Sequence, residues 1–267
     1  MLTLHPSPPQ FAGDFEIHLT VRADADGRTA DDRATSPPGP ADDGPDDNGP
    51  ADDGPGDDRL ALLAAECGWK YARIVLDRGR VPAQPMVTLR TAGTLAAARA
   101  VADGAARRLR EAGWAVVRTK VEAAPWARGV PGRDTEGVAL GPGYYFEHHI
   151  KLLLEPGTDT TATAAVADRH AAHLSRNARR IREDGRAERF VTQRCRLVGR
   201  DTAGRRLAAL TAELGALGHE MVSVEREFVV YDSDETLDAG WIREGHGTDG
   251  GRAGRAAAGT RAGEETR

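Results

Sequence analysis

Hydrophobic and polar residues alternate in the same way in two stretches of the chain, residues 15–21 and residues 146–152. Both read Phe-Glu-x-His followed by an aliphatic residue, any residue and a second aliphatic residue. A period of two is typical of a β-strand with one buried face and one polar face. We therefore expect two strands in which the glutamate and the histidine share one face and the aliphatic residues form the other.

Each of these strands opens a series of elements with the same order along the chain. The first series is a strand at 15–21, a helix at 59–67, strands at 69–77 and 86–90, a helix at 95–112 and a strand at 114–122. The second series is a strand at 144–154, a helix at 161–171, strands at 172–181 and 190–198, a helix at 202–217 and a strand at 221–231. The order βαββαβ is that of the ferredoxin-like unit. The patterns thus predict an α+β fold of two tandem ferredoxin-like repeats, with sheets that close around a polar, barrel-like interface.

Two details favour an internal duplication. Residues 87–90 (Val-Thr-Leu-Arg) have a counterpart in residues 191–194 (Val-Thr-Gln-Arg). The spacing from Gly113 to Glu122 also equals the spacing from Gly218 to Glu227. A tandem repeat is the simplest explanation of both matches.

Composition changes along the chain and sets the predicted boundaries. An acidic run with almost no apolar residues cannot bury enough surface to offset its ordering entropy, so we expect it to be disordered. The predicted organisation is an N-terminal extension at 1–14, a first repeat at 15–122 with a disordered acidic insertion at 24–58, a linker at 123–143, a second repeat at 144–243 and a disordered tail at 244–267.

The cysteines and the apolar runs of the chain argue against a disulfide-rich, a secreted or a membrane-spanning protein. The chain of 267 residues has a formal net charge of −5, and its two cysteines, Cys67 and Cys195, lie in unrelated patterns that indicate neither a disulfide framework nor a metal knuckle. The N-terminus lacks the basic and apolar regions of a signal peptide, and no apolar run reaches membrane-spanning length. We expect a cytoplasmic protein that does not enter a membrane.

Strand alternation gathers basic residues on one face of the predicted sheets. The chain has only three lysines, and two of them, Lys120 and Lys151, fall on this face. Several arginines and lysines around a closed interface suit a multiply charged anion such as a di- or triphosphate. The predicted phosphate-binding residues are Arg90, Arg118, Lys120, Lys151, Arg194 and Arg196.

The same face carries carboxylates and imidazoles. Glutamates in such a site would bind a divalent cation through oxygen ligands, and the cation would bridge to phosphates. The predicted metal ligands are Glu16, Glu147, Glu225 and Glu227. His18 and His149 are the predicted catalytic residues, as proton-transfer groups or ligand donors.

Residues 147–151 (Glu-His-His-Ile-Lys) resemble the E-x-E-x-K strand of the CYTH (triphosphate tunnel metalloenzyme) superfamily. Residues 224–228 (Val-Glu-Arg-Glu-Phe) resemble the paired-glutamate strand near the C-terminal end of that family. The resemblance implies two fused ferredoxin-like halves that form a tunnel, and hydrolysis of, or transfer from, triphosphates or polyphosphate with Mg or Mn. In this chain His149 stands where the signature has its middle glutamate, and the N-terminal strand carries Glu16 and His18 instead of the full motif.

A second resemblance implies a different enzyme. Residues 18–20 (His-Leu-Thr) and 173–175 (His-Leu-Ser) are H-x-[T/S] pairs, similar to those of the two-histidine phosphoesterases, which act on cyclic phosphates and RNA ends. In that family one histidine is the base, the other is the acid, and the hydroxyls hold phosphate oxygens. The second pair, however, does not lie in the strand equivalent to that of His18.

A third class, a non-catalytic ligand-binding or protein-interaction module, explains the same polar face without chemistry. In both enzyme interpretations the expected partner is a phosphorylated small molecule. Nucleic acid is not an expected partner, because the basic cluster at 176–186 has interleaved acids and no aromatic platform. The sequence leaves the oligomeric state open.

Overall fold

The computed structural model describes residues 9–23, 55–181 and 184–241. This described part contains eight β-strands, five α-helices and one short 3-10 helix. The strands are β1 (Ala12–Ala23), β2 (Lys70–Leu76), β3 (Ala83–Thr94), β4 (Trp114–Ala123), β5 (Tyr145–Leu154), β6 (Ala172–Ile181), β7 (Ala187–Arg196) and β8 (Glu220–Asp232). The helices are α1 (Pro55–Glu66), α2 (Leu95–Glu111), α3 (Asp134–Leu140), α4 (Thr161–Arg169), α5 (Arg200–Ala216) and the 3-10 helix η2 (Glu235–Asp238).

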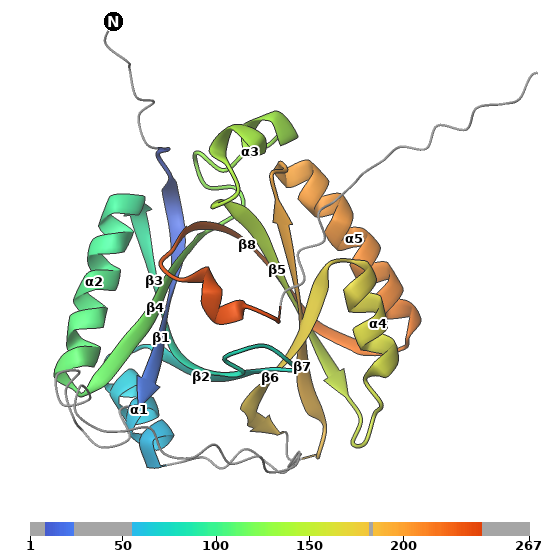
Figure 1. The fold of residues 1–267 in the computed structure, drawn as a ribbon, viewed down its shortest axis with the longest axis horizontal. Coiled ribbons are helices and arrows are strands. Elements are labelled where there is room, and N and C mark those ends of the chain that lie inside the picture. Colours follow the sequence, from blue (N-terminus) through green and yellow to red (C-terminus); the bar gives the residue numbers. More distant parts are fainter. Residues whose placement is uncertain (1–8, 24–54, 182–183, 242–267) are drawn as a thin grey trace, which may run out of the picture.

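The described strands form one closed barrel in which all neighbours are antiparallel (Figure 1). The order around the barrel is β1-β3-β2-β6-β7-β5-β8-β4. The first four strands therefore lie in the order β4-β1-β3-β2, and the last four lie in the equivalent order β8-β5-β7-β6. The halves meet where β2 pairs with β6 and where β4 pairs with β8. The prediction that the fold combines helices with β-sheet is confirmed, and the sheet is antiparallel.

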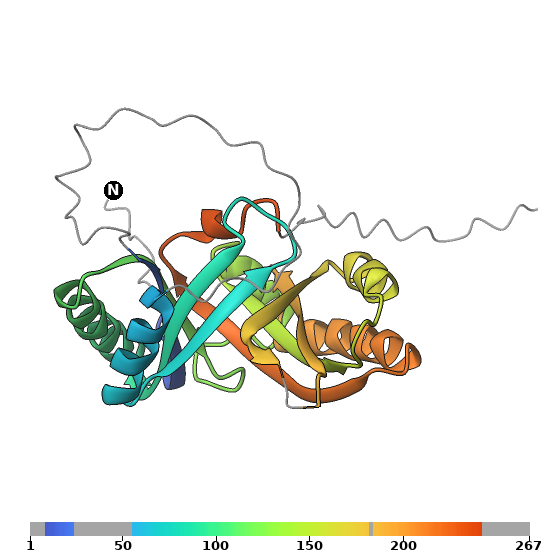
Figure 2. The ribbon, with the colours of Figure 1, turned by 90° about the horizontal axis from the view of Figure 1, so that it is seen from below.

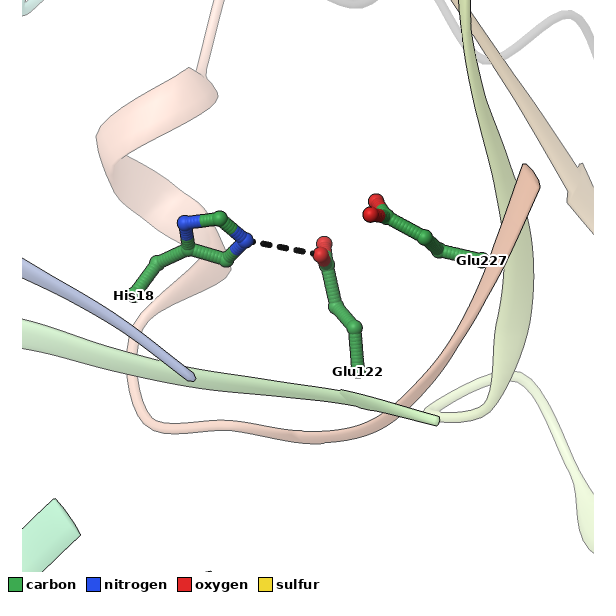
Figure 3. A group of neighbouring side chains, drawn as sticks. All are labelled: His18, Glu122 and Glu227. Carbon is green, nitrogen blue, oxygen red and sulfur yellow. Dashed lines mark hydrogen bonds and ion pairs between the residues drawn. The ribbon is translucent and has the colours of Figure 1, made fainter. Parts of the chain in front are cut away.

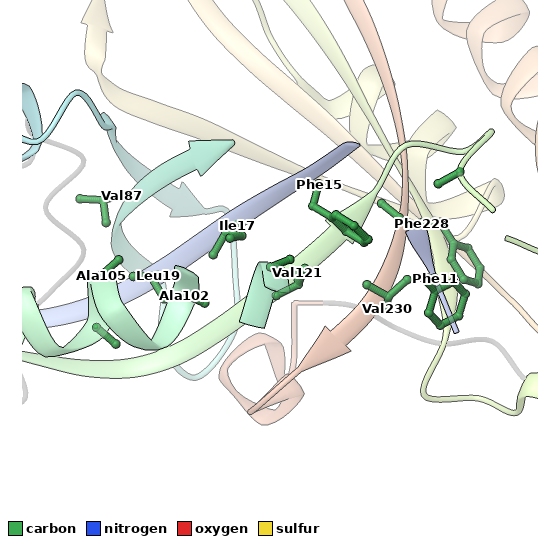
Figure 4. Close-up of a cluster of buried hydrophobic side chains, with 14 of the residues drawn as sticks. Phe11, Phe15, Ile17, Leu19, Val87, Ala102, Ala105, Val121, Phe228 and Val230 are labelled. Atoms are coloured by element: carbon green, nitrogen blue, oxygen red, sulfur yellow. The ribbon is translucent and has the colours of Figure 1, made fainter. Parts of the chain in front are cut away.

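Helices cover the outside of the barrel on two opposite sides (Figure 2). The apolar side of β1 faces α2: Phe15, Ile17 and Leu19 are buried in one cluster with Ala102 and Ala105 of the helix (Figure 4). A second cluster joins the apolar side of β5 to α4 and α5 through residues that include Ile150, Leu152, Val166, Leu210 and Leu214. Because each strand alternates, its polar side chains must point away from the helices and into the barrel. The predicted division of β1 and β5 into an apolar and a polar side is confirmed.

The segment predicted as a linker, residues 123–143, contains α3, which the sequence patterns did not indicate. This helix packs against the connection between β7 and α5. A Cβ atom at Gly137 would lie 2.3 Å from the backbone oxygen of Val198, so only glycine fits at this contact. The Pro- and Gly-rich composition therefore reflects close packing here, as well as turns.

Two predicted boundaries differ from the structure. Phe11 is buried in the core and β1 begins at Ala12, so the N-terminal extension is shorter than residues 1–14. α1 begins at Pro55, so the last part of the predicted insertion, 24–58, is helical. The rest of that insertion and the tail at 244–267 lie outside the described residues.

Residues 233–241, which we call the C-terminal segment, follow β8 and include η2 (Figure 1). They are tied to the barrel at several points: Arg80 donates its backbone N–H to Ala239, and the Trp241 indole donates to the backbone oxygen of Leu174. Trp241 and Asp238 are buried, and both line the barrel cavity. Among the described residues, no helix has both the length and the apolar character that a membrane crossing requires.

Candidate functional site in the barrel interior

The barrel interior contains a cavity with a volume of about 160 Å³. Most residues that the sequence predicts as functional line it, namely Glu16, His18, Arg118, Lys120, Glu147, His149, Lys151, Arg194, Glu225 and Glu227. Arg90 and Arg196 are not part of this lining. The cavity therefore collects acids, bases and imidazoles from strands of both halves.

His18 of β1 is held from two sides. Its Nδ1 lies 2.9 Å from the hydroxyl oxygen of Thr88 on β3, and its Nε2 lies 2.8 Å from Oε2 of Glu122 on β4. Burial by itself would lower the pKa of His18, but the adjacent Glu122 carboxylate outweighs burial and raises it. An imidazole with one nitrogen on a hydroxyl and the other on a carboxylate has a fixed orientation.

His149 of β5 has an equivalent set of neighbours. Its Nδ1 lies 3.0 Å from the hydroxyl oxygen of Thr192 on β7, and its Nε2 lies 3.4 Å from Oε2 of Glu227 on β8. Burial by itself would lower the pKa of His149, but the adjacent carboxylates of Glu227 and Glu147 raise it to about 9. This imidazole is therefore protonated at neutral pH.

Lys120 of β4 lies between two buried carboxylates. Its ammonium group is 2.6 Å from Oε1 of Glu122 and also contacts Oε2 of Glu147. Burial alone would lower the pKa of Lys120, but these two carboxylates raise it well above its usual value. In turn, Lys120 and the other nearby cations hold the pKa of Glu122 and Glu147 well below the usual value, against the effect of burial.

Two predicted phosphate-binding arginines are already paired with acids. Arg194 of β7 donates to Oε1 of Glu147 at 2.6 Å and to Oδ2 of Asp238 at 2.5 Å. Arg118 of β4 donates to Asp232 and lies 3.0 Å from Oδ2 of Asp238. Asp238 belongs to the C-terminal segment, so this segment places a carboxylate between two arginines at the barrel interior. A phosphate oxygen would need the same position to contact both guanidinium groups.

The other predicted bases lie toward the edge of the site. The Lys151 ammonium is 3.8 Å from Oε2 of Glu188 and 5.3 Å from the centre of the Phe190 ring. Arg90 donates to Glu16 at 2.7 Å, and its side chain is 78% exposed. Arg196 stacks on the Tyr145 ring and pairs with Glu235. Of these, Lys151 alone lines the cavity.

Two groups of side chains in the cavity have donor atoms close enough to share a metal ion. One is His18, Glu122 and Glu227, and the other is Glu122, Glu147 and His149; within each group the donor atoms lie within 4.8 Å of one another. Figure 3 shows the first group, in which all three side chains point toward a common centre. Of the predicted metal ligands, Glu147 and Glu227 are included, whereas Glu16 and Glu225 are in neither group.

Glu227 lies in an unbalanced environment. Burial and the negative charge of Glu122 raise the pKa of Glu227 to about 7. Its Oε2 atom is buried and has no hydrogen-bond partner in the described part of the chain. The carboxyl groups of Glu122 and Glu227 thus approach each other at the centre of the cavity, and a proton or a metal ion between them would relieve their repulsion.

The second H-x-[T/S] pair does not bring its histidine to this centre. His173 is buried at one end, where Nη2 of Arg78 lies 2.8 Å from its Nδ1 and the Trp241 ring packs against it. The side chain of Ser175 lines the cavity. The partner of His18 in the equivalent strand is His149, with a hydroxyl from Thr192 of the neighbouring strand.

The sequence prediction missed several residues of the site. Glu122 is central to both metal-ligand groups, and its spacing from Gly113, equal to that of Glu227 from Gly218, was the available signal. Asp232 and Asp238 carry no such signal, because they follow the last predicted strand. Glu188 and Gln84 also line or contact the site without a repeated pattern.

Neither protein-family models nor curated proteins match this chain.

Proposed function

We propose that the barrel interior binds a phosphorylated small molecule of the triphosphate or polyphosphate class together with a divalent cation, and hydrolyses it. The observation that carries this proposal is the closed barrel with buried bases and metal-ligating carboxylates in one cavity. A ligand with several negative charges and a bound cation would use both kinds of group. An ordinary apolar ligand would use neither.

We interpret the chain as two tandem ferredoxin-like repeats of the CYTH type. The equivalent strand orders of the two halves support this interpretation. The pairing register supports it too: Glu16 lies opposite Arg90 and Glu122, and Glu147 lies opposite Arg194 and Glu227. The resemblance of residues 147–151 to the E-x-E-x-K strand then falls on the inner side of β5.

A divalent cation fits the residues present. The buried Oε2 of Glu227 has no hydrogen-bond partner in the described residues, and it lies close to donor atoms of Glu122 and His18. The resemblance implies Mg or Mn as the ion. A bound cation would polarise a phosphate oxygen and offset the charge of the phosphate.

The protein's own residues would hold and protonate the substrate. Lys151 faces the cavity beside an aromatic ring and would bind a phosphate oxygen as a point charge. Arg194 would turn from Asp238 toward the substrate. The protonated imidazole of His149, held at Nδ1 by Thr192, would donate a proton from Nε2 to the leaving oxygen.

Binding is tested by thermal unfolding with inorganic tripolyphosphate, with and without Mn²⁺ or Mg²⁺. A ligand of the folded state raises the melting temperature by mass action, and the rise should be larger with the cation. The variant Lys151→Ala should weaken binding about tenfold, the scale of one charge-assisted bond. Arg169→Ala removes an exposed arginine of α4 outside the barrel and should bind as the unmutated protein does.

Release of inorganic phosphate by the unmutated protein and by His149→Gln tests the hydrolytic step. We expect His149→Gln to bind tripolyphosphate but to release phosphate much more slowly. If tripolyphosphate at millimolar concentration produces no shift with either cation, the phosphate ligand is wrong. A non-catalytic interaction module then accounts better for the internally paired charges.

A two-histidine phosphoesterase is the second candidate. It is favoured by the matched pairs His18–Thr88 and His149–Thr192, in which each imidazole contacts a hydroxyl across a strand pair. One imidazole would act as base and the other as acid on a cyclic phosphate. Turnover of a 2′,3′-cyclic nucleotide in the presence of EDTA, with no turnover of tripolyphosphate, would favour this candidate.

A further inference from the structure

The two metal-ligand groups share Glu122 but differ in what already lies beside them. In the group Glu122, Glu147 and His149, the Lys120 ammonium contacts both carboxylates. In the group His18, Glu122 and Glu227, no lysine or arginine of the described residues forms an ion pair with Glu227. The ammonium therefore lies between the two acids of the group Glu122, Glu147 and His149. In the other group it contacts Glu122 alone, and the partner of Glu227 is the His149 imidazole at 3.4 Å.

We propose that His18, Glu122 and Glu227 hold a single divalent transition-metal ion, of the Mn, Co or Zn class, and that the Lys120 ammonium takes the place of a second ion. This inference deepens the proposed function, on which its catalytic meaning rests. It concerns the metal site alone, however, and can be tested without any phosphate ligand.

The donor set decides the class of ion. Mg²⁺ prefers oxygen ligands in a near-ideal octahedron, whereas imidazole nitrogen combined with carboxylate oxygen suits Mn, Fe, Co and Zn. The three donor atoms lie within 4.8 Å of one another. An ion about 2.1 Å from each ligand accepts donor atoms up to roughly 4.2 Å apart, so a small inward movement completes the site. Three protein ligands leave positions open for a phosphate oxygen or water.

The surroundings of His18 also suit a ligand. Its Nδ1 lies 2.9 Å from the Thr88 hydroxyl, an outer contact that fixes the ring and leaves Nε2 facing the carboxylates. Glu122 is 1% exposed, and Oε2 of Glu227 is buried with no hydrogen-bond partner in the described residues. A metal cation at this point would bind the Glu227 oxygen, which His149 approaches only to 3.4 Å, and would remove the repulsion between the two carboxylates.

His149 then has a different role from His18. Its Nε2 lies 3.7 Å from Oε2 of Glu147, which Lys120 also contacts, and 3.4 Å from Oε2 of Glu227. The asymmetry assigns one imidazole to the metal ion and leaves the other for the proton. The strand pattern alone, which is the same around both histidines, does not distinguish them.

The test is a titration of the metal-free full chain with Co²⁺, Zn²⁺, Mn²⁺ and Mg²⁺ by calorimetry, with visible absorption as a second signal for Co²⁺. We expect one ion per chain and an affinity for Co²⁺ at least about 100-fold higher than for Mg²⁺. His18→Gln and Glu227→Gln should each weaken Co²⁺ binding tenfold or more. His170→Gln, which alters a histidine–glutamate pair outside the barrel, should leave it unchanged.

The Lys120→Met variant tests the second half of the proposal. Without the ammonium group, Glu122, Glu147 and His149 should accept a second ion, and the stoichiometry should rise from one to two. If this variant does not fold, the stoichiometry of the unmutated chain decides this half of the proposal: one Co²⁺ per chain supports it and two overturn it. X-ray absorption of the Co²⁺ form then tests the ligands, for which we expect one imidazole nitrogen and the rest oxygen.

Each contrary result overturns the proposal. These results are no Co²⁺ binding, equal affinity for Mg²⁺ and Co²⁺, two ions bound by the unmutated chain, or full Co²⁺ affinity in His18→Gln. Failure of tripolyphosphate to bind would remove the proposed function and leave the metal site intact. Tripolyphosphate binding without any metal binding would do the reverse.

Discussion

The two halves of the barrel contain the same ion pair in two environments. Glu16 accepts from Arg90 at 2.7 Å between β1 and β3, and Glu147 accepts from Arg194 at 2.6 Å between β5 and β7. The Arg90 side chain is 78% exposed, whereas that of Arg194 is 5% exposed. Strand pairing sets the contact in both halves. Its surroundings differ because the C-terminal segment, through Asp238, covers the second arginine and leaves the first in solvent.

The largest effect should come from truncating these two arginines. Arg194→Ala leaves Glu147 and Asp238 without this buried partner, and breaking a buried pair typically destabilises by about 3–5 kcal/mol. Arg90→Ala removes an exposed, solvent-screened pair and should cost less than about 1 kcal/mol. The free energy of unfolding in urea measures both. Equal losses would show that the C-terminal segment does not shelter the second pair.

Asp238→Asn examines the same asymmetry from the side of the C-terminal segment. The amide keeps the shape of the side chain but removes the charge between Arg118 and Arg194, each of which retains another acid. We expect a loss of about 1–3 kcal/mol in stability, the scale for a charged group left with a weaker partner. Tripolyphosphate affinity should rise, because the carboxylate no longer competes for the two guanidinium groups. An affinity that falls would mean that Asp238 helps to hold the ligand.

The pH dependence of the free energy of unfolding should reveal that His149, in the second half of the barrel, is protonated. The pKa of His149 in the folded chain is about 9, above the 6.5 of the unfolded chain. Between pH 6.5 and pH 9 the folded state therefore binds more protons than the unfolded state. The contribution of His149 to the free energy of unfolding is complete below pH 6.5 and is lost as pH rises through 9. In EDTA, urea unfolding at pH 7 and pH 9 should show a decrease, with a slope of at most about 1.4 kcal/mol per pH unit for one proton. His149→Gln should reduce this slope.

Glu227 also lowers the stability of the folded state as pH rises, but over a lower pH range than His149. Its pKa of about 7 in the folded chain lies above the 4.5 of the unfolded chain, so its contribution is lost as pH rises through that window. Glu122 and Glu147 act in the opposite direction, because their pKa values are lowered and their contribution is lost as pH falls below 4.5. A stability that increases steadily from pH 5 to pH 9 would contradict this set of charges.

The strand pattern was sufficient to place the inward residues of β1 and β5. A period of two positions both histidines in the cavity, and one buried face per strand fixes which side is inward. The pattern could not show that Arg118 and Arg194 would meet Asp238. The interaction joins strands to a segment beyond the last periodic element, and no local rule links such distant residues.

The sequence also failed where packing, not periodicity, creates structure. α3 is only seven residues long and lies in a Pro- and Gly-rich stretch, so its composition favours turns. Its position depends on the contact of Gly137 with the β7–α5 connection. The metal-ligand groups were predicted in part, because alternation identifies which carboxylates are inside but not which of them share a centre.

The smallest expected effect compares the first turns of the two long helices, α2 and α5. Thr94 caps α2 locally, since its hydroxyl accepts from the backbone N–H of Ala97 at 3.2 Å. At the equivalent end of α5 the cap residue is Gly199, and the acceptor is Asp134 of α3, which accepts from the Gly199 N–H at 2.8 Å and from the Thr202 hydroxyl at 2.9 Å. The first cap comes from one residue, and the second requires α3 to be in place.

Thr94→Ala should therefore lower the free energy of unfolding by about 1 kcal/mol, the usual loss for a hydroxyl cap. Asp134→Ala should also lower it, and in addition should increase amide hydrogen exchange in both α3 and the first turn of α5, because the two segments share this carboxylate. Thr94→Ala should affect exchange only around the start of α2. If Asp134→Ala left exchange in α5 unchanged, α3 would be an attachment to the barrel that plays no part in ordering the second half. The chain would then cap α5 by solvent alone, and the two halves would differ only in their ion pairs.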